Sequence, residues 1–385
     1  MHIVQLANFY GETSGGLRTA MVELASGYVA RGHRVTRVVP GADDTSTDDG
    51  GVRTISVASP LVPGMGGYRA IRSASLAQEI IEDVRPDVIE LSDKTTLAIA
   101  ADRARRRGAA PVVLMSHERI DAILSQRVPK YFPLAAAADL WNRRLASRVD
   151  AVVCASRFAA QEFERIGASN IEVMPLGADL VRWHPGARTG RQSYTATIVM
   201  VGRLSAEKHP MLGIETIREL CRRGVTSRLI VAGAGPMLGT LVAASRGLPV
   251  EFVGHISDRD RLVQLVADAD VALAPCPFET FGLSALEAMA AGTPIVIPTA
   301  GALPELAATG AARVVEGTGS QFADAVQAFL SGDRDIQRLV CRDRAEQFSW
   351  ERAVDRMLKL FVRVSGTMPA ATNTAATTRG EVVLV

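Results

Sequence analysis

Short runs rich in Val and Ile alternate with longer helical patterns along most of this chain. That alternation constrains the fold more than any other feature, because it predicts βαβ units and mostly parallel sheets. The first series of predicted strands is His2–Leu6, Arg34–Val39, Asp87–Leu91, Pro111–Met115 and Asp150–Cys154. The second series is Thr197–Val201, Arg228–Ala232, Val250–Val253, Asp270–Ala274 and Pro294–Ile297.

The two series predict two domains, since 385 residues are long for a single core. A polar stretch rich in turn-forming residues, 182–193, lies between them and is predicted to be a linker. We expect an α/β fold of two Rossmann-like, doubly wound domains, 1–181 and 194–348, that face a central cleft. An amphipathic helix at 349–365 begins at a capping serine and could cross back to the first domain. The Thr- and Ala-rich segment 366–385 is predicted to be a disordered tail.

The charge balance of 43 basic against 41 acidic residues argues against a general nucleic-acid binder. The four cysteines are scattered without metal-ligand spacing and are expected to be reduced thiols. Asp258 with Asp260, and Asp268 with Asp270, lie at helix and strand boundaries, so we predict no metal at either pair. No signal peptide and no apolar run of roughly 20 residues is visible, which predicts a cytoplasmic protein.

The most specific motif places two glutamates, Glu279 and Glu287, around a strand-to-helix turn that contains Gly282. The backbone N–H groups near Gly282 and Leu283 would face an anion at the start of the helix, where the helix dipole favours negative charge. The carboxylates would then be free to accept hydrogen bonds from sugar or ribose hydroxyls. For either glutamate alone, an ordinary solvated side chain is an equally good interpretation.

Other residues are expected near the same cleft. Arg203 and Lys208 follow the first strand of the second domain, and two cations there could neutralise a diphosphate without a metal. Gly16, in a diglycine after the first strand, could let the backbone approach a phosphate. The segment 233–236, Gly-Ala-Gly-Pro, either lines the cleft or forms a tight turn. His117 ends a strand of the first domain, a position suited to a reacting centre.

Taken together, these residues resemble the retaining glycosyltransferases of family 4, which have the GT-B fold. Segments 8–19, 90–96, 116–119 and 202–209 are similar to actinobacterial phosphatidylinositol mannoside α-mannosyltransferases, especially those that add the third mannose. The resemblance implies that GDP-mannose is the donor substrate and that no cofactor or metal is required. It also implies retention of configuration by same-face attack, with the leaving phosphate oxygen helping to deprotonate the acceptor.

The same resemblance implies a role for each matching position. Gly16 would approach the donor phosphate, and Arg203 with Lys208 would hold the diphosphate beside Gly282 and Leu283. His117 and Glu279 would contact the transferred sugar, and Glu287 would contact the ribose.

The implied acceptor is a phosphatidylinositol mannoside, which would bring the enzyme to the inner face of the plasma membrane as a peripheral protein. Anionic lipid could meet the arginines 103 and 105–107 or the segment 127–132. Ordinary solvated charges are the somewhat better interpretation of the arginines, and a mobile loop packed on the domain is that of 127–132. Glu90, Asp93 and Lys94 end another strand, where an acceptor polyol could bind. A UDP-sugar transferase, a GT-B nucleotide-sugar 2-epimerase and a non-catalytic sugar-nucleotide-binding protein remain alternatives.

Overall fold

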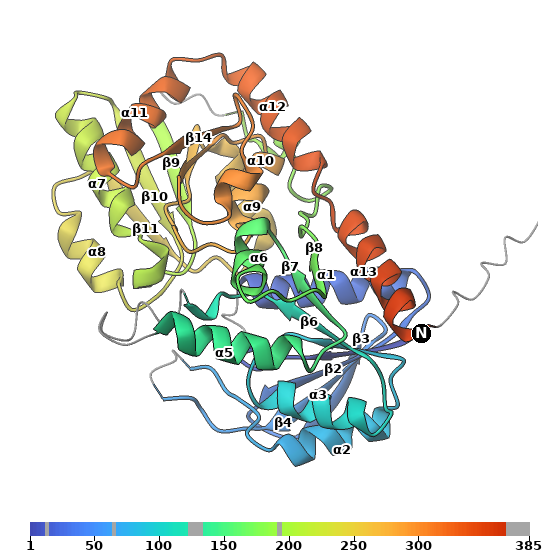
Figure 1. Ribbon diagram of the computed structural model, residues 1–385. Coiled ribbons are helices and arrows are strands. Elements are labelled where there is room, and N and C mark those ends of the chain that lie inside the picture. Colours follow the sequence, from blue (N-terminus) through green and yellow to red (C-terminus); the bar gives the residue numbers. More distant parts are fainter. Residues whose placement is uncertain (12–14, 64–66, 122–133, 191–194, 367–385) are drawn as a thin grey trace, which may run out of the picture.

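The computed structural model describes residues 1–11, 15–63, 67–121, 134–190 and 195–366, and these form two sheets, each with helices on both faces (Figure 1). The first sheet has the strand order β3-β4-β2-β1-β5-β6-β7-β8. All of its pairings are parallel except that of β3 with β4. Its strands are β1 (His2–Leu6), β2 (Arg34–Gly41), β3 (Thr45–Asp49), β4 (Val52–Ala58), β5 (Val88–Leu91), β6 (Val112–Ser116), β7 (Ala151–Cys154) and β8 (Ile171–Val173).

The second sheet is parallel throughout, in the order β11-β10-β9-β12-β13-β14. This is the doubly wound arrangement, in which the strand order reverses between β9 and β12. Its strands are β9 (Ala196–Val201), β10 (Ser227–Ala232), β11 (Val250–Gly254), β12 (Val271–Leu273), β13 (Ile295–Pro298) and β14 (Ala312–Val315).

Helices cover both faces of each sheet. The α-helices of the first half are α1 (Gly16–Ala30), α2 (Ala74–Val84), α3 (Thr96–Arg106), α5 (Leu134–Ala146) and α6 (Arg157–Glu164). Those of the second half are α7 (Met211–Arg222), α8 (Leu238–Ala244), α9 (Arg259–Asp268), α10 (Leu283–Ala290), α11 (Gly319–Leu330), α12 (Arg334–Glu346) and α13 (Trp350–Ser365). Short 3-10 turns are η1 (Pro185–Ala187), η2 (Ala206–Lys208) and η3 (Leu303–Leu306).

The apolar core forms three clusters, and the alternation of side chains along the strands decides which cluster each residue joins. Val4 and Leu6 of β1 face α2 and α3, whereas Ile3 faces α1. In the second half, α7 and α11 cover one face of the sheet and α9, α10 and α12 pack on the other. The cluster under α1 continues through α13 into the second half, so one core joins both sheets.

Helix α13 crosses back and lies beside α1 (Figure 1). Ser349 caps it, with its side chain accepting a hydrogen bond from the backbone of Arg352. The ring of Phe361 meets Tyr28 of α1 edge to face, with centroids 5.6 Å apart. The last helix of the chain is therefore part of the packing of the first sheet.

The structure contains all ten strands predicted from the sequence, within the one or two residues by which strand ends are ordinarily uncertain. The sequence analysis missed β3, β4, β8 and β14, and β3 is a fully exposed polar strand. The predicted tail lies almost entirely outside the described residues, as does the end of the predicted linker. The domain limits given above remain predictions.

We expect Gly27→Ala to destabilise the protein by about 1–3 kcal/mol, although Ala normally favours a helix. A Cβ on Gly27 would lie 2.3 Å from Cγ2 of Val354, where α1 contacts α13. Gly239→Ala in α8 is the matched control, because its Cβ would meet nothing within 4 Å and should leave stability unchanged or slightly raised. Urea unfolding compares the two variants. Equal effects would mean that α13 does not pack on α1 as described.

Candidate active site

The predicted donor residues gather at the carboxyl ends of β9 and β12, the two strands between which the strand order of the second sheet reverses. The loop after β9 carries Arg203 and leads to Lys208 in η2. The loop after β12 carries Glu279 and leads to α10. In open α/β sheets a crevice at such a reversal is where ligands bind.

Lys208 and Glu279 form an ion pair across these loops, with 2.7 Å between Nζ and Oε2. Burial acts to lower the pKa of Lys208, but the Glu279 carboxylate outweighs it and holds the pKa above its usual value. Lys208 therefore stays a cation at neutral pH, positioned by a side chain from the other loop.

Arg203 reaches toward the first half of the chain, and its guanidinium lies over the ring of Tyr68, in the connection between β4 and α2, 5.5 Å from the centroid. The segment 233–236 packs against the backbone of the loop that carries Arg203. A Cβ on Gly233 would lie 1.9 Å from the carbonyl oxygen of Gly202, and one on Gly235 would lie 2.3 Å from that of Leu204. Glycine at both positions therefore allows this segment to pack closely against the Arg203 loop.

Gly282 is the N-cap of α10 and has a φ of 101° that other residues rarely adopt. A Cβ there would also lie 2.2 Å from a methyl group of Leu303. From the first half of the chain, a Cβ built on Gly16 at the start of α1 would lie 3.7 Å from Cδ1 of Leu283. The positive ends of α1 and α10 therefore meet, which creates a favourable environment for an anion.

Glu287 lies within α10, one turn after the first backbone N–H groups of that helix. Its side chain is only 14% exposed. Burial raises the pKa of Glu287 to about 7, opposed by Arg259 and assisted by the carboxylates of Glu23 and Asp179. Arg259 lies 3.7 Å from Glu287 and also reaches Thr19 of α1, at 3.5 Å. Residues from both halves of the chain thus surround this carboxyl group.

His117 follows β6, and its Nε2 lies 3.0 Å from the hydroxyl oxygen of Ser92. Burial and the nearby Lys94 cation lower the pKa of His117 to about 4. The imidazole is therefore neutral at pH 7 and can act as a hydrogen-bonding dipole, with no charge of its own. The carbonyl of His117 accepts a hydrogen bond of 2.6 Å from the hydroxyl of Thr280, which directly follows Glu279.

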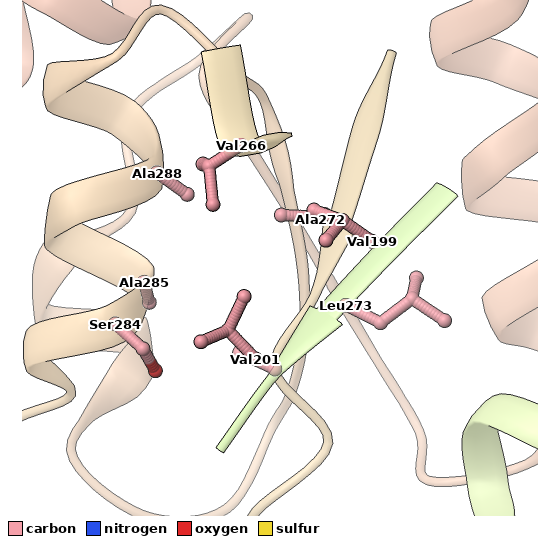
Figure 2. A pocket seen from close by; sticks show the side chains of 9 residues that line it. Val199, Val201, Val266, Ala272, Leu273, Ser284, Ala285 and Ala288 are labelled. Atoms are coloured by element: carbon pink, nitrogen blue, oxygen red, sulfur yellow. The ribbon is translucent and has the colours of Figure 1, made fainter. Parts of the chain in front are cut away.

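A small apolar cavity of about 10 Å³ lies behind α10, and Figure 2 shows Ser284, Ala285 and Ala288 facing Val199 and Val201 across it. It is too small for a nucleotide and lacks the polar groups that would orient one. Its lining residues form the packing that fixes α10 against β9.

Three residues predicted to meet an acceptor have other roles. Glu90 is 1% exposed and accepts hydrogen bonds from Tyr28 and Gln5, while burial raises its pKa to about 7. Asp93 is 5% exposed and accepts hydrogen bonds from the backbone N–H groups of Thr95, just before α3, and of Leu97 in its first turn. Lys94 pairs with Glu162 at 2.6 Å. The acceptor prediction is therefore wrong for Glu90 and Asp93, because both carboxylates are used in the interior.

The acidic pairs excluded as metal sites have structural partners. Asp258 caps α9 by accepting from two backbone N–H groups, and Asp270 binds the backbone of Thr197 and pairs with Arg334. Within the described residues, no group of three or more His, Cys, Asp or Glu side chains is arranged to hold a metal. All four cysteines are free. The predicted lipid-facing segment 127–132 lies outside the described residues.

The sequence analysis missed Arg259, Thr280, Ser156 and Glu305, which connect the two halves of the site. Ser156 carried a signal, since it lies two residues after β7 and directly precedes α6, as capping residues do. Glu305 follows a glycine-containing turn after β13. Nothing in the sequence alone shows which helix a distant carboxylate would contact.

Two family models cover most of the chain. One, described as Glycosyltransferase Family 4, matches residues 14–182, and one described as Glycosyl transferases group 1 matches residues 195–332. A phosphatidylinositol dimannoside mannosyltransferase of Mycobacterium tuberculosis, named as α-(1-6)-specific and GDP-mannose-dependent, is 42% identical over 93% of this chain and 95% of its own length. The chain belongs to the family 4 glycosyltransferases.

The solved structures agree in fold. Sucrose-phosphate synthase from Thermosynechococcus elongatus superposes with a TM-score of 0.77 at 20% identity, over 95% of this chain and 99% of its own. The glycosyltransferase WaaG, involved in lipopolysaccharide biosynthesis, gives a TM-score of 0.70 at 16% identity, over 95% and 100% of the two chains. The predicted GT-B architecture and the resemblance to actinobacterial mannosyltransferases are both confirmed, and this family 4 chain is a glycosyltransferase.

We expect replacement of Glu287 by Gln to stabilise the protein more at high pH than at low pH. The carboxyl group is protonated in both folded and unfolded states well below pH 4.5, and it carries the full cost of a buried charge well above pH 7. Between these values the stability of the native protein should fall relative to the variant by about 1–3 kcal/mol. Urea unfolding at pH 5 and pH 8 measures this difference.

The control is Glu316→Gln, at an exposed position. The difference in unfolding free energy between this variant and the native protein should be the same at both pH values. A difference for Glu287→Gln that is the same at both pH values would contradict the assigned environment of Glu287.

Proposed function

We propose that this glycosyltransferase moves mannose from GDP-mannose, with retention of configuration, onto a phosphatidylinositol mannoside at the cytoplasmic membrane face. The observation that carries the proposal is the meeting of two cations and two helix N-termini at the reversal point of the second sheet. The choice of donor and acceptor is supported by the 42% identity to the mycobacterial dimannoside mannosyltransferase over nearly the full length of both chains.

In this proposal the donor diphosphate lies between Arg203 with Lys208 and the first N–H groups of α10. The leaving group of the reaction is a nucleoside diphosphate, so negative charge grows there as the glycosidic bond breaks. Fixed cations and helix N-termini stabilise that charge without reorganising, which lowers the barrier. The backbone at Gly16 would approach the same phosphate from the first domain, and Glu287 would accept hydrogen bonds from the ribose.

The sugar would lie between His117 and Glu279. The neutral imidazole can accept or donate a hydrogen bond to a sugar hydroxyl and places no positive charge beside the electron-poor anomeric carbon. Glu279, held by Lys208, supplies a negative charge near the same carbon. Attack from the face of the leaving group would let a phosphate oxygen take the acceptor proton, so the proposal needs neither a metal nor an enzymic nucleophile.

A lipid acceptor requires a route to the membrane surface. Among the described residues no helix is long and apolar enough to cross a bilayer. A groove of about 530 Å³ between α2 and α3 is lined by Arg103, Arg106 and Arg107 together with Ser75, Gln78 and Glu79. Arg106 and Arg107 each approach one carboxylate, yet both side chains are more than 60% exposed. We propose that these three arginines meet anionic lipid headgroups.

A transfer assay read by mass spectrometry tests the proposal. Purified protein is incubated with each of several GDP- and UDP-sugars and an actinobacterial lipid extract, with every component omitted in turn. Addition of one hexose to phosphatidylinositol dimannoside with GDP-mannose alone, unchanged by chelator, is the expected result. Transfer from a UDP-sugar, or to another acceptor, would reject the assigned substrates. Conversion of the donor without acceptor would indicate a 2-epimerase, and binding without turnover a non-catalytic protein.

Replacing Arg203 or Lys208 by Ala should lower kcat/KM for transfer by about 10- to 100-fold, the usual effect of losing one charge-assisted hydrogen bond. Arg222→Ala on α7 removes an exposed cation outside the site and serves as the control. Initial rates at varied GDP-mannose concentration give both parameters. Unchanged kinetics in both site variants would show that the donor diphosphate does not bind beside Arg203 and Lys208.

Replacing Arg103, Arg106 and Arg107 together by Ser should weaken binding to vesicles that contain anionic lipid. Each basic side chain near such a surface contributes about 1 kcal/mol, so roughly 100-fold is expected for three. The control replaces three exposed arginines of the second half, Arg218, Arg222 and Arg246. Vesicle flotation measures the fraction bound. Equal losses in the two triple variants would exclude the α2–α3 groove as the membrane contact.

A further inference from the structure

Helix α6 belongs to the first sheet, but it begins against the second half of the chain (Figure 1). Its N-cap is Ser156, whose hydroxyl oxygen accepts a hydrogen bond of 3.0 Å from the backbone of Ala159. The same hydroxyl donates a hydrogen bond of 2.6 Å to the carbonyl of Thr280. One capping side chain therefore serves its own helix and also holds the loop that carries Glu279.

The next two N–H groups of α6 are bound by a carboxylate from the second half. The backbone of Arg157 donates to Oε2 of Glu305 at 2.9 Å, and that of Phe158 donates to Oε1 at 2.8 Å. A helix leaves its first N–H groups without intrahelical partners, and its positive end favours an anion. Glu305 and Ser156 together satisfy the N–H groups of residues 157, 158 and 159.

Glu305 is itself fixed to the donor side of the site. It lies in η3, where Arg344 donates to the carbonyl of Glu305 at 2.7 Å and to that of Leu306 at 3.0 Å. Leu303 of the same turn packs on Gly282, the residue that begins α10. A shift of Glu305 relative to α6 would therefore accompany a shift of α10 relative to the first half.

A further hydrogen bond links the two proposed sugar contacts. The hydroxyl of Thr280 donates to the carbonyl of His117 at 2.6 Å, so the residue after Glu279 is tied to His117 itself. We call the contacts of Ser156, Thr280 and Glu305 with the opposite half the clasp. The clasp thus consists of four hydrogen bonds, each of which joins the first half of the chain to the second.

We propose that Glu305 is a positioning residue that holds the two domains in the arrangement needed for transfer, by capping α6 from across the cleft. The inference rests on the proposed function for its kinetic readout alone. Separation of the domains would break the clasp and leave two backbone N–H groups at the start of α6 to water. The clasp thus adds its stabilisation only when His117 and Glu279 lie next to one another, and it sets the fraction of molecules that are ready to react.

The clasp can be tested by removing a backbone donor without removing the helix. Arg157 is the first residue of α6, a position where Pro is well tolerated, and Ser156 before it is extended at φ −153° and ψ 165°. Arg157→Pro deletes the N–H that Glu305 accepts. Arg157→Ala removes the same side chain and keeps the N–H, so it is the matched control.

Domain separation is read from the distance between spin labels on Ser147→Cys of the first half and Ala243→Cys of the second, in a Cys221→Ser background. Both labelled positions are exposed, and the remaining cysteines are buried. We expect Arg157→Pro and Glu305→Ala to populate a second label-to-label distance and to lower kcat/KM by about 3- to 30-fold, with Arg157→Ala unchanged. The variant carrying both Arg157→Pro and Glu305→Ala should be no worse than Glu305→Ala, because both act on one interaction.

Glu305→Gln keeps an amide oxygen as acceptor and should fall between wild type and Glu305→Ala. Identical distance distributions and kinetics for Arg157→Pro and Arg157→Ala would overturn the proposal. So would loss of thermal stability in Glu305→Ala with no change of distance, since that marks a purely structural role. If the wild-type protein transfers no mannose, the proposed function fails, and the label distances still decide whether the clasp holds the domains.

Discussion

The positive ends of α1, α6 and α10 all lie at the boundary between the two sheets, and much of the site depends on how they are neutralised. Helix α6 receives the carboxylate of Glu305. Helices α1 and α10 meet at Gly16 and Leu283, beside the loops of Arg203 and Lys208. One helix end is thus occupied by the protein's own anion, while the other two form the place where we propose the donor diphosphate binds.

Burial and ion pairing together determine which side chains at this boundary are charged. Glu279 lies in an ion pair at 2.7 Å and holds Lys208 as a cation, whereas the ion pair of Glu287 with Arg259 is longer, at 3.7 Å, and burial raises the pKa of Glu287 to about 7. His117 is neutral for the same physical reason, since burial disfavours its charged form. The proposed diphosphate end of the site is therefore cationic, and the proposed sugar end combines a neutral imidazole with a carboxylate.

The sequence predicted the elements well, because buried parallel strands are continuous apolar runs and each is bounded by polar residues. It missed β3, whose residues Thr45–Asp49 are polar and fully exposed and pair with β4 at the edge of the sheet. A strand without a buried face has no apolar signal to detect. The available signal was the Gly50-Gly51 dipeptide between two short extended segments. Both glycines have positive φ values, as a two-residue hairpin turn requires.

Site residues that follow strands could be identified because each apolar run that predicts a strand also shows where the loop after that strand begins. Lys208 and Glu279 were each assigned to the site, but their direct ion pair was not predicted. It depends on how two loops lie relative to each other, and the two residues are 71 positions apart in the sequence. Glu90 shows the limit of the approach. It lies near the carboxyl end of β5 as a site residue would, yet its side chain is buried and accepts a hydrogen bond from Tyr28 of α1.

The measurement that tests the central claim most directly is a crystal structure of the protein with GDP. We predict a diphosphate within hydrogen-bonding distance of Arg203, Lys208 and the backbone of Leu283, and a ribose against Glu287. A nucleotide bound elsewhere, or in this cleft with its ribose on the Arg203 side and its phosphates at Glu287, would contradict the account.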